Sequence, residues 1–325
     1  MSRARKTGGR APAGPRGRRP RVIAGGRVEP AAESRRETAP PKGFLDRFKP
    51  AVIKRIEAEI ADRLSKVPNR LNEYGFDPWG LDLEVLKRSM ISSVLSYRYW
   101  FRVKTTGIEN LPAGRMLVVG NHAGQVAIDG MMVGTAMILE ADPPRIARGM
   151  GEFWLPTIPW FNVFMHRIGG VVGTPKNCVD LLRNEEAVMV FPEGVRGMNK
   201  LFWQRYQLQR FGLGFMRLAI ETHSPIVPVA VVGSEEQTIA IANLKPLARL
   251  LGMPAFPVTP TWPLLGPIGM IPLPVRYYIQ FGRPMRFDGD PDDEDQVIER
   301  KVDQVKRAIS DMIAEMRARR KNIFS

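Results

Sequence analysis

The stretch MLVVGNHAGQVAID, residues 116–129, carries the strongest structural signal in this chain of 325 residues. Its first four residues are apolar and predict a buried strand, and a polar Asn-His pair that includes His122 follows after one glycine. A second stretch, AVMVFPEGVR at 187–196, repeats this order: an apolar run precedes Glu193 and Arg196 on a Pro/Gly turn. Open α/β folds bind ligands where their parallel strands end. We therefore expect both polar segments at the same edge of a sheet.

Apolar runs and helical patterns alternate from about residue 102 onward. We expect strands at 116–119, 187–191, 226–232 and 275–281, and helices near 128–140, 176–186, 212–223 and 292–320. This alternation predicts an α/β fold with a mostly parallel sheet flanked by helices. The last helix has an apolar stripe at spacings of four and three, formed by Ile298, Val302, Val305, Ile309, Met312 and Met316.

Two helical stretches precede the sheet. Residues 44–66 repeat an apolar side chain every fourth residue, with an interruption near Pro50, and a second helix is expected over 83–100. Packing on the body of the protein and lying on a membrane surface explain the first helix equally well. We expect three regions: a tail at 1–42, a helical extension at 43–101 that is a candidate for membrane-surface contact, and an α/β domain at 102–325.

The positive charge of the chain is concentrated at its beginning. The whole sequence carries +15, and 12 Lys/Arg against 3 Asp/Glu give residues 1–42 a net charge of +9. This tail has too few apolar residues to offset the entropy of ordering, so we expect it to be disordered. It is then either a solvated arm or a contact for anionic lipids or nucleic acid. Nucleic acid is the less favoured partner, because no Arg/aromatic recognition pattern recurs in the body.

The cysteine content and the hydropathy of the sequence limit where in the cell the protein can function. The single cysteine, Cys178, fits a reducing compartment, and its apolar neighbours favour a packed thiol over a catalytic one. No uncharged apolar run of about 18 residues predicts a membrane-spanning helix. No apolar stretch follows the N-terminal charges, so a signal peptide is not expected. Two apolar segments, 153–164 and the proline-rich 250–275, are either buried by the body or contact a bilayer.

His122 is a candidate general base, because an imidazole can remove a proton from a hydroxyl near neutral pH. It needs a partner on its other ring nitrogen, and Asp129 is the nearest downstream carboxylate. In a continuous helix, seven residues would separate the two by about 10.5 Å, so their pairing requires a turn, which Gly124 favours. The spacing by itself is weak evidence, since a loop histidine is more often structural.

The 191–196 turn offers an anion site. Arg196 can bind a phosphate through two parallel hydrogen bonds. Glu193 can orient Arg196 or accept a hydrogen bond from the substrate. The alternative is a surface turn with an ion pair worth less than about 1 kcal/mol.

Together these motifs resemble the lysophospholipid/glycerol-phosphate acyltransferase superfamily, in particular a bacterial branch labelled phospholipid/glycerol acyltransferase. The resemblance covers roughly residues 74–288. Its motifs occur in the same order here: His122 with a downstream Asp129, FPEGVR at 191–196, YQLQRFG at 206–212, PIVPV at 225–229, VGSEE at 232–236 and FGRP at 281–284.

The resemblance implies roles for these residues. His122 would deprotonate the acceptor hydroxyl, which attacks an acyl thioester, and Asp129 would orient His122. Arg196, with Glu193 and Gly194, would hold the glycerol-phosphate end of the acceptor.

Two further motifs of the superfamily fall on this chain. Gly170 and Lys176 lie where a second acceptor-binding motif falls, and Pro228 belongs to a motif that shapes the acyl side. The sequence departs from the commonest pattern in two ways. Six residues instead of four separate His122 from Asp129, a gap that the bacterial branch shares, and Lys176 is the nearest cation to the usual arginine of the second motif.

We therefore expect an O-acyltransferase that moves a fatty acyl chain from acyl-CoA or acyl-carrier protein to a lysophospholipid or glycerol-phosphate-like acceptor. It would need no metal and no tightly bound cofactor, and it would lie on the cytoplasmic face of the cell membrane with anionic lipids as partners. The alternatives are a non-catalytic basic protein that binds membrane or nucleic acid, and a lipid or thioester hydrolase on the same fold.

Overall fold

The computed structural model describes residues 50–68, 71–122, 127–152, 158, 160–250 and 256–324. Residues Gly43–Ser325 form one compact unit. The expectations for the basic tail at 1–42, for the turn at Gly124 and for parts of both apolar segments fall outside the described residues.

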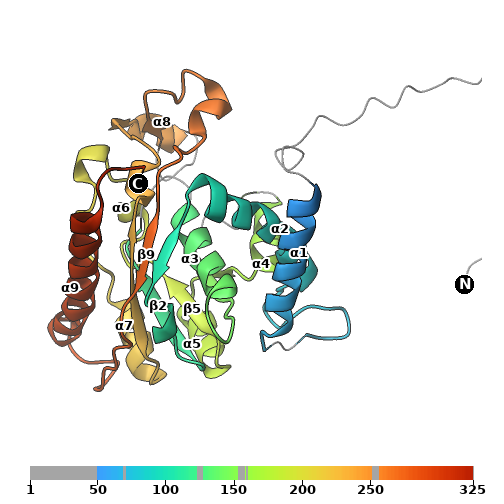
Figure 1. The fold of residues 1–325 in the computed structure, drawn as a ribbon. Helices are drawn as coiled ribbons and strands as arrows, with labels where there is room; N and C mark the ends of the chain where they lie inside the picture. Colours follow the sequence, from blue (N-terminus) through green and yellow to red (C-terminus); the bar gives the residue numbers. More distant parts are fainter. Residues whose placement is uncertain are drawn as a thin grey trace, which may run out of the picture. The chain divides into compact units, whose positions relative to one another are not determined.

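A seven-stranded sheet forms the centre of this unit, with the strand order β1-β9-β6-β2-β5-β3-β4 (Figure 1). Neighbouring strands are parallel, except that β6 and β9 are antiparallel. The predicted fold class, a mostly parallel sheet flanked by helices, is therefore confirmed. The strands are β1 (Lys104–Thr106), β2 (Met116–Gly120), β3 (Ala147–Gly151), β4 (Val171–Val172), β5 (Ala187–Val190), β6 (Ile226–Val232) and β9 (Tyr278–Phe281).

The sequence predicts β2, β5 and β6 to within one residue at each end, because each is a run of apolar residues that the sheet buries. β9 is shorter than expected and begins at Tyr278 instead of residue 275. Three strands of this sheet were not predicted. β3 has the sequence ARGMG, in which an arginine and two glycines leave no apolar run, while β1 and β4 are only three and two residues long.

The register brings the ends of the parallel strands together. Val119 of β2 pairs with Val190 of β5, and Gly120 pairs with Val229 of β6. β3 lies parallel to β5 on its other side. The segments that follow β2, β3, β5 and β6 therefore leave the sheet at one edge, which we call the carboxyl edge.

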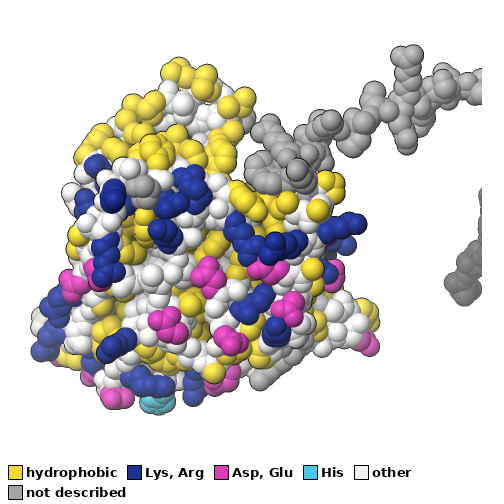
Figure 2. Space-filling model, in the orientation of Figure 1, with side chains coloured by type: hydrophobic (Ala, Val, Ile, Leu, Met, Phe, Trp, Pro, Cys, Tyr) yellow, Lys and Arg dark blue, Asp and Glu magenta, His cyan; other side chains and the backbone are white. Residues whose placement is uncertain are grey.

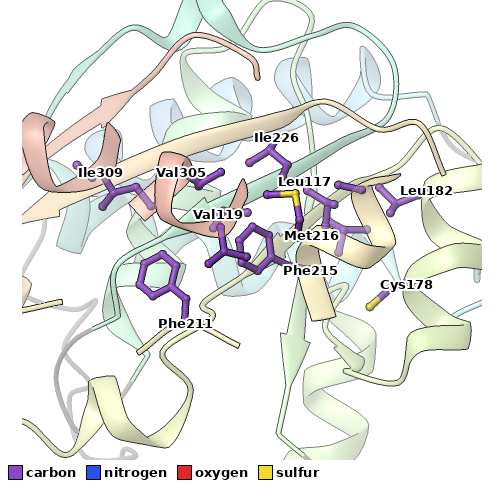
Figure 3. Packing of buried hydrophobic residues seen from close by; sticks show 14 of the residues in the cluster. Leu117, Val119, Cys178, Leu182, Phe211, Phe215, Met216, Ile226, Val305 and Ile309 are labelled. Carbon is purple, nitrogen blue, oxygen red and sulfur yellow. The ribbon is translucent and has the colours of Figure 1, made fainter. Parts of the chain in front are cut away.

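Helices cover both faces of the sheet. On one face, α3 packs against β2 and β6, and α1 and α2 pack outside α3. On the other face, side chains of α5, α7 and α9 meet Leu117, Val119 and Ile226 (Figure 3). These helices are α1 (Pro50–Ser65), α2 (Leu83–Leu95), continued by a π-helix at Ser96–Trp100, α3 (Ile128–Leu139), α5 (Pro175–Arg183), α7 (Gly214–Glu221) and α9 (Asp295–Arg319).

The apolar faces of the first and last helices are both buried. All six residues of the predicted stripe on α9 lie in the core, which confirms that prediction. α1 buries Ile56, Ile60 and Leu64 against α2 and α3. Of the two explanations for this helix, packing on the body is the one that the structure shows for these three side chains. α1 and α2 belong to the same compact unit as the sheet.

Shorter elements lie between the main ones. They are α4 (Phe161–Arg167), α6 (Val195–Met198), α8 (Lys245–Leu250), a small sheet of β7 (Ala242–Asn243) and β8 (Pro257–Val258), and 3₁₀ helices at Ile108–Asn110, Phe202–Gln204, Ser234–Glu236 and Gly266–Met270. Within the described part of the chain, none of the helices combines the length and the apolar character needed to cross a bilayer.

Candidate active site

His122 and Asp129 meet at the carboxyl edge of the sheet. His122 follows β2, and Asp129 lies in the first turn of α3, which begins at Ile128. Nδ1 of His122 is 2.8 Å from Oδ2 of Asp129, and both side chains are buried. Ala127 is not helical and α3 begins at Ile128, so no continuous helix holds the two residues about 10.5 Å apart. The spacing left this pairing open, and the structure shows it.

The two neighbours of the imidazole leave one nitrogen for a substrate. The carboxylate of Asp129 accepts a hydrogen bond at Nδ1, so the neutral ring carries its proton there and Nε2 offers a lone pair. The ring of Phe191 stacks on the imidazole with 4.4 Å between centroids and 17° between planes. No hydrogen bond joins Nε2 to another of the described residues. In the neutral ring, Nε2 of His122 is thus able to accept a proton.

Opposing influences set the pKa of His122. Burial lowers it, because desolvation penalises the imidazolium form. The charge of Asp129, its hydrogen bond and the charge of Glu193 raise it, and they outweigh both burial and the smaller opposing effect of Lys200. The pKa of His122 therefore lies above its ordinary value of 6.5, and its neutral form is a stronger base than a free imidazole.

Asn121 anchors the backbone that carries His122. Its side-chain amide donates to the carbonyl of Val231 at 3.0 Å, and its side-chain oxygen accepts the N–H of Val231 at 2.8 Å. These two bonds extend the ladder between β2 and β6 beyond its last backbone pair, Gly120 and Val229. The position of His122 is therefore set by the sheet itself.

Glu193 supports the same backbone from the other side. Its Oε1 accepts the N–H of His122 at 3.0 Å, and its Oε2 accepts the N–H of Gln209 at 2.8 Å. The side chain is fully buried, and Nζ of Lys200 lies 3.3 Å from Oε2. No bond joins Glu193 to Arg196 among the described contacts. The expectation was that Glu193 orients Arg196 or meets the acceptor, whereas this geometry favours a role in holding His122.

Lys200 links Glu193 to a second buried carboxylate. Its Nζ is 2.9 Å from Oε1 of Glu235, and Oε2 of Glu235 accepts the N–H of Tyr206. Burial raises the pKa of Glu235, although Lys200 acts against this effect. Lys200 was not singled out from the sequence, whereas Gln209 lies in the matched motif YQLQRFG. Tyr206 and Glu235 lie in the matched motifs YQLQRFG and VGSEE, but nothing in the sequence showed that Lys200 joins those motifs to the turn.

Arg196 is the exposed cation of this turn. It lies on α6, and no other described residue forms a hydrogen bond or ion pair with it. Gly194 precedes the helix with a φ of 54°, a conformation that favours glycine. At Gly197 a Cβ atom would lie 3.0 Å from the carbonyl oxygen of His122, so only glycine lets α6 approach so closely. Arg196 is therefore held beside the His122 segment and is available to an anion.

Comparisons with known proteins agree with this arrangement. A profile of the acyltransferase family matches residues 102–232, which include the His122–Asp129 pair, the 191–196 turn and β6. An uncharacterised protein of Mycobacterium leprae is 38% identical over 261 residues, which cover 78% of this chain and 70% of the relative. The chain belongs to the acyltransferase family.

Two further proteins are similar to this chain at lower sequence identity. A chicken protein described as a DGAT1/2-independent enzyme synthesizing storage lipids is 23% identical over 193 residues, or 59% of this acyltransferase and 54% of the relative. Among solved structures, the 1-acyl-sn-glycerophosphate acyltransferase of Thermotoga maritima aligns with a TM-score of 0.46 and 18% identity. That alignment covers 74% of this chain and 80% of the other.

Two other predicted site residues, Lys176 and Gly170, lie next to β4, away from the His122 segment. Lys176 is on the first turn of α5, after β4, and its Nζ is 2.5 Å from Asp180 at the surface. Gly170 immediately precedes β4 and packs tightly against Met165. β4 is three strands from β2, about 14 Å at the usual strand spacing. The structure therefore does not bring Lys176 and Gly170 together with His122.

Pro228 lies on the face of the sheet opposite to His122. It lines a pocket of about 500 Å³ together with Gly282, Met312 and Arg283, and neither His122 nor Arg196 lines this pocket. The structure therefore does not bring Pro228 together with the His122 segment.

The acyltransferase buries its single thiol. Cys178 packs in the core, and burial raises its pKa to about 11, so the thiol stays protonated near neutral pH. This agrees with the expected packing role. Within the described residues, no group of three or more His, Cys, Asp or Glu side chains is arranged to hold a metal ion.

Proposed function

We propose that this acyltransferase moves a fatty acyl chain from acyl-CoA or acyl-carrier protein to a hydroxyl of a lysophospholipid or glycerol-phosphate-like acceptor. The observation that carries the proposal is the buried pair of His122 and Asp129, 2.8 Å apart, at the edge where the second family motif also emerges. No tightly bound cofactor is required, because the thioester is already an activated acyl group.

In the first step, Nε2 of His122 takes the proton of the acceptor hydroxyl while the hydroxyl oxygen attacks the thioester carbonyl carbon. Asp129 stabilises the imidazolium that forms, as the carboxylate of a hydrolase triad does. The tetrahedral intermediate then collapses, the carbon–sulfur bond breaks, and the leaving thiolate receives the proton from His122. The products are the acylated acceptor and a free thiol, and His122 ends neutral.

The anionic end of the acceptor would bind at the 191–196 turn. Arg196 is exposed and free of a described ion pair, so its guanidinium can take a phosphate without breaking an existing contact. Glu193 and Gly194 would shape the turn rather than touch the phosphate. We place Lys176 at the far end of an extended acceptor and Pro228 in support of the sheet behind the site. A lipid acceptor and an anionic donor both fit a basic protein on the cytoplasmic face of the cell membrane.

The direct test replaces His122. With a radiolabelled acyl-CoA and lysophosphatidic acid, we expect His122→Ala to lower kcat/KM at least 10³-fold while the protein remains folded. His223→Asn is the matched control, because His223 is an exposed histidine after α7, at the opposite edge of the sheet. Wild-type transfer by His122→Ala would exclude this mechanism. Release of free fatty acid with equal rates in the presence and absence of acceptor would instead show hydrolysis.

A further inference from the structure

Residues 256–273 form an apolar lobe that carries exposed hydrophobic side chains. The surrounding sequence 250–275 contains seven prolines and no charged residue. In the lobe, Leu264 is 83% exposed and Ile268 is 70% exposed. Leu265, Met270 and Ile271 are also exposed, as are Ile241 and Leu244 beside the lobe. Figure 2 shows a hydrophobic area at the top of the view, where Figure 1 places α8.

The exposed side chains are held on an ordered backbone. The hydroxyl of Thr259 accepts the N–H of Trp262 at 2.8 Å, and the hydroxyl of Thr261 donates to the carbonyl of Gly269 at 2.9 Å. Gly269 allows this close approach, because a Cβ there would lie 2.3 Å from the carbonyl oxygen of Thr261. Hydrogen bonds to its own backbone thus hold the lobe in shape while Leu264, Leu265 and Ile268 point outward.

The topology places the lobe at the edge of the sheet that carries His122. The lobe lies between the end of β6 and the start of β9, which runs antiparallel to β6. Both ends of this connection therefore lie at the carboxyl edge. Just after the lobe, Tyr277 is buried within reach of the charge of Asp129, which contributes with burial to the raised pKa of Tyr277.

A second apolar surface leaves the same edge. It follows β3 and comprises the beginning of α4, where Trp160 is 86% exposed and Phe161, Val163 and Phe164 are also exposed. Monomeric soluble proteins rarely expose contiguous apolar surfaces of this kind without a partner. Two of them at one edge, on either side of β2, indicate that this edge of the protein faces an extended apolar surface.

Basic side chains lie next to the base of the lobe. The guanidinium of Arg102 donates to the carbonyl of Pro274 at 2.7 Å, and Arg205 lies over Phe202, whose N–H bonds to Ala240 next to the lobe. In Figure 2 a band of Lys and Arg side chains lies directly below the hydrophobic area. An apolar projection with cations behind it matches a bilayer that contains anionic lipid, because the cations then meet the headgroups when the projection enters the acyl region.

Resting on the acyl-transfer function proposed above, we infer that the apolar lobe is the element by which this protein inserts into an anionic bilayer. Insertion sets the carboxyl edge of the sheet against the headgroups. A lipid acceptor then reaches His122 and Arg196 from the membrane without passing through water. The lobe side chains leave water on binding, and their apolar area supplies the part of the affinity that salt does not screen.

The test compares two paired variants of the full chain on vesicles of phosphatidylcholine with phosphatidylglycerol. We expect Leu264→Gln/Ile268→Gln to lower vesicle partitioning at least tenfold at about 0.5 M salt, where contributions of exposed charges are largely screened. Leu264→Ile/Ile268→Leu keeps the apolar area and should bind like the wild type. Tyr74→Gln removes an equally exposed aromatic ring outside the lobe and should also bind normally.

The outcomes separate this inference from the proposed activity. Wild-type partitioning by the Gln pair, or equal losses in the Gln pair and the apolar-for-apolar pair, would overturn the lobe assignment. A dimer in vesicle-free buffer that the Gln pair abolishes would assign the lobe to a second copy and overturn it as well. Transfer to a short-chain, monomeric lysolipid in solution should be unchanged in the Gln pair. If the wild type lacks this transfer, the proposed function fails while the partitioning result still decides the role of the lobe.

Discussion

At the residue scale, the contact between Asp129 and His122 makes a pH-dependent prediction. The Asp129 charge is the main reason that the pKa of His122 is raised, and catalysis needs the neutral imidazole. We expect Asp129→Asn to lower kcat by up to about 10⁴-fold, because the amide no longer fixes the tautomer or stabilises the imidazolium. The acid limb of the pH–rate profile should move to lower pH, since burial still lowers the pKa while the attraction is lost. Steady-state kinetics from pH 5 to 9 measure both effects.

The control for this substitution is Asp62→Asn, which neutralises an exposed carboxylate paired with Lys66 on α1. It should leave the profile unchanged. An Asp129→Asn enzyme with a reduced rate and an unshifted acid limb would contradict the assignment of that limb to His122.

Lys200 gives a prediction about stability. It lies between the buried carboxylates of Glu193 and Glu235, and its removal leaves both without their cation. We expect Lys200→Met to lower the free energy of unfolding by about 3–5 kcal/mol. The loss should be smaller at pH 5 than at pH 8, because burial already raises the pKa of Glu235 and a protonated carboxyl needs no cation. Urea denaturation at the two pH values measures it.

Lys66→Met is the matched comparison, since Lys66 pairs with Asp62 at the surface of a helix. Its expected cost is about 0.3–0.5 kcal/mol. Equal losses in the two variants would show that the buried carboxylates do not depend on Lys200.

The residues that sequence reasoning identified and the ones it missed differ in how their contacts are encoded. His122, Asp129 and Arg196 carry their chemistry in their own side chains, so type and position pointed to them. The contacts of Glu193 could not be predicted, because its partners are the backbone N–H groups of His122 and Gln209. Backbone donors have no signature in a sequence, and neither does the approach of a lysine to two distant carboxylates.

At the scale of elements, the approach of α6 to the segment after β2 predicts the effect of a single methyl group. A Cβ at residue 197 would lie 2.9 Å from Cβ of Glu193 and 3.0 Å from the carbonyl oxygen of His122. We expect Gly197→Ala to displace His122 and to lower kcat/KM by about 10²-fold, because small errors in the position of a base are costly. Acyl-transfer kinetics measure the rate, and thermal unfolding shows whether the fold is kept.

Gly214→Ala is the control, because it begins α7 and has nothing within 4 Å of a built Cβ. Its rate should be unchanged and its stability the same or higher by up to about 1 kcal/mol. Full activity in Gly197→Ala would mean that α6 does not constrain His122.

Elements with a clear apolar period were predictable, and the rest were decided by tertiary pairing. β2, β5, β6 and α9 each carry enough buried apolar residues to specify themselves. β3 is a strand although it has the sequence ARGMG, because β5 pairs with it and Arg148 is neutralised by Asp77 and Glu186. The spacing of His122 and Asp129 left their pairing open, because the pairing depends on where α3 begins, at Ile128.

At the scale of the whole molecule, the distribution of charge and apolar surface separates two contributions to membrane binding. Residues 1–42 carry 12 of the 48 Lys/Arg, while the apolar lobe and the site belong to the compact unit that begins at Gly43. The apolar segments 153–164 and 250–275 could not be assigned to the core or the surface from sequence, since an apolar segment has the same hydropathy whether it is buried or exposed. The described residues of both segments include large apolar side chains at the surface, such as Trp160 and Leu264.

This separation predicts the result of deleting residues 1–42. Each Lys/Arg near an anionic surface contributes about 1 kcal/mol, so four engaged side chains would account for roughly 10³-fold in affinity at low salt. We expect the truncated protein to lose most of its binding to phosphatidylglycerol vesicles at low salt and little at 0.5 M salt, where the uncharged lobe remains. Transfer to a soluble acceptor should be unchanged, because the His122 site lies within Gly43–Ser325. An equal loss at both salt concentrations would contradict this division. A tail that retains nucleic acid but not vesicles at matched salt would favour the nucleic-acid alternative.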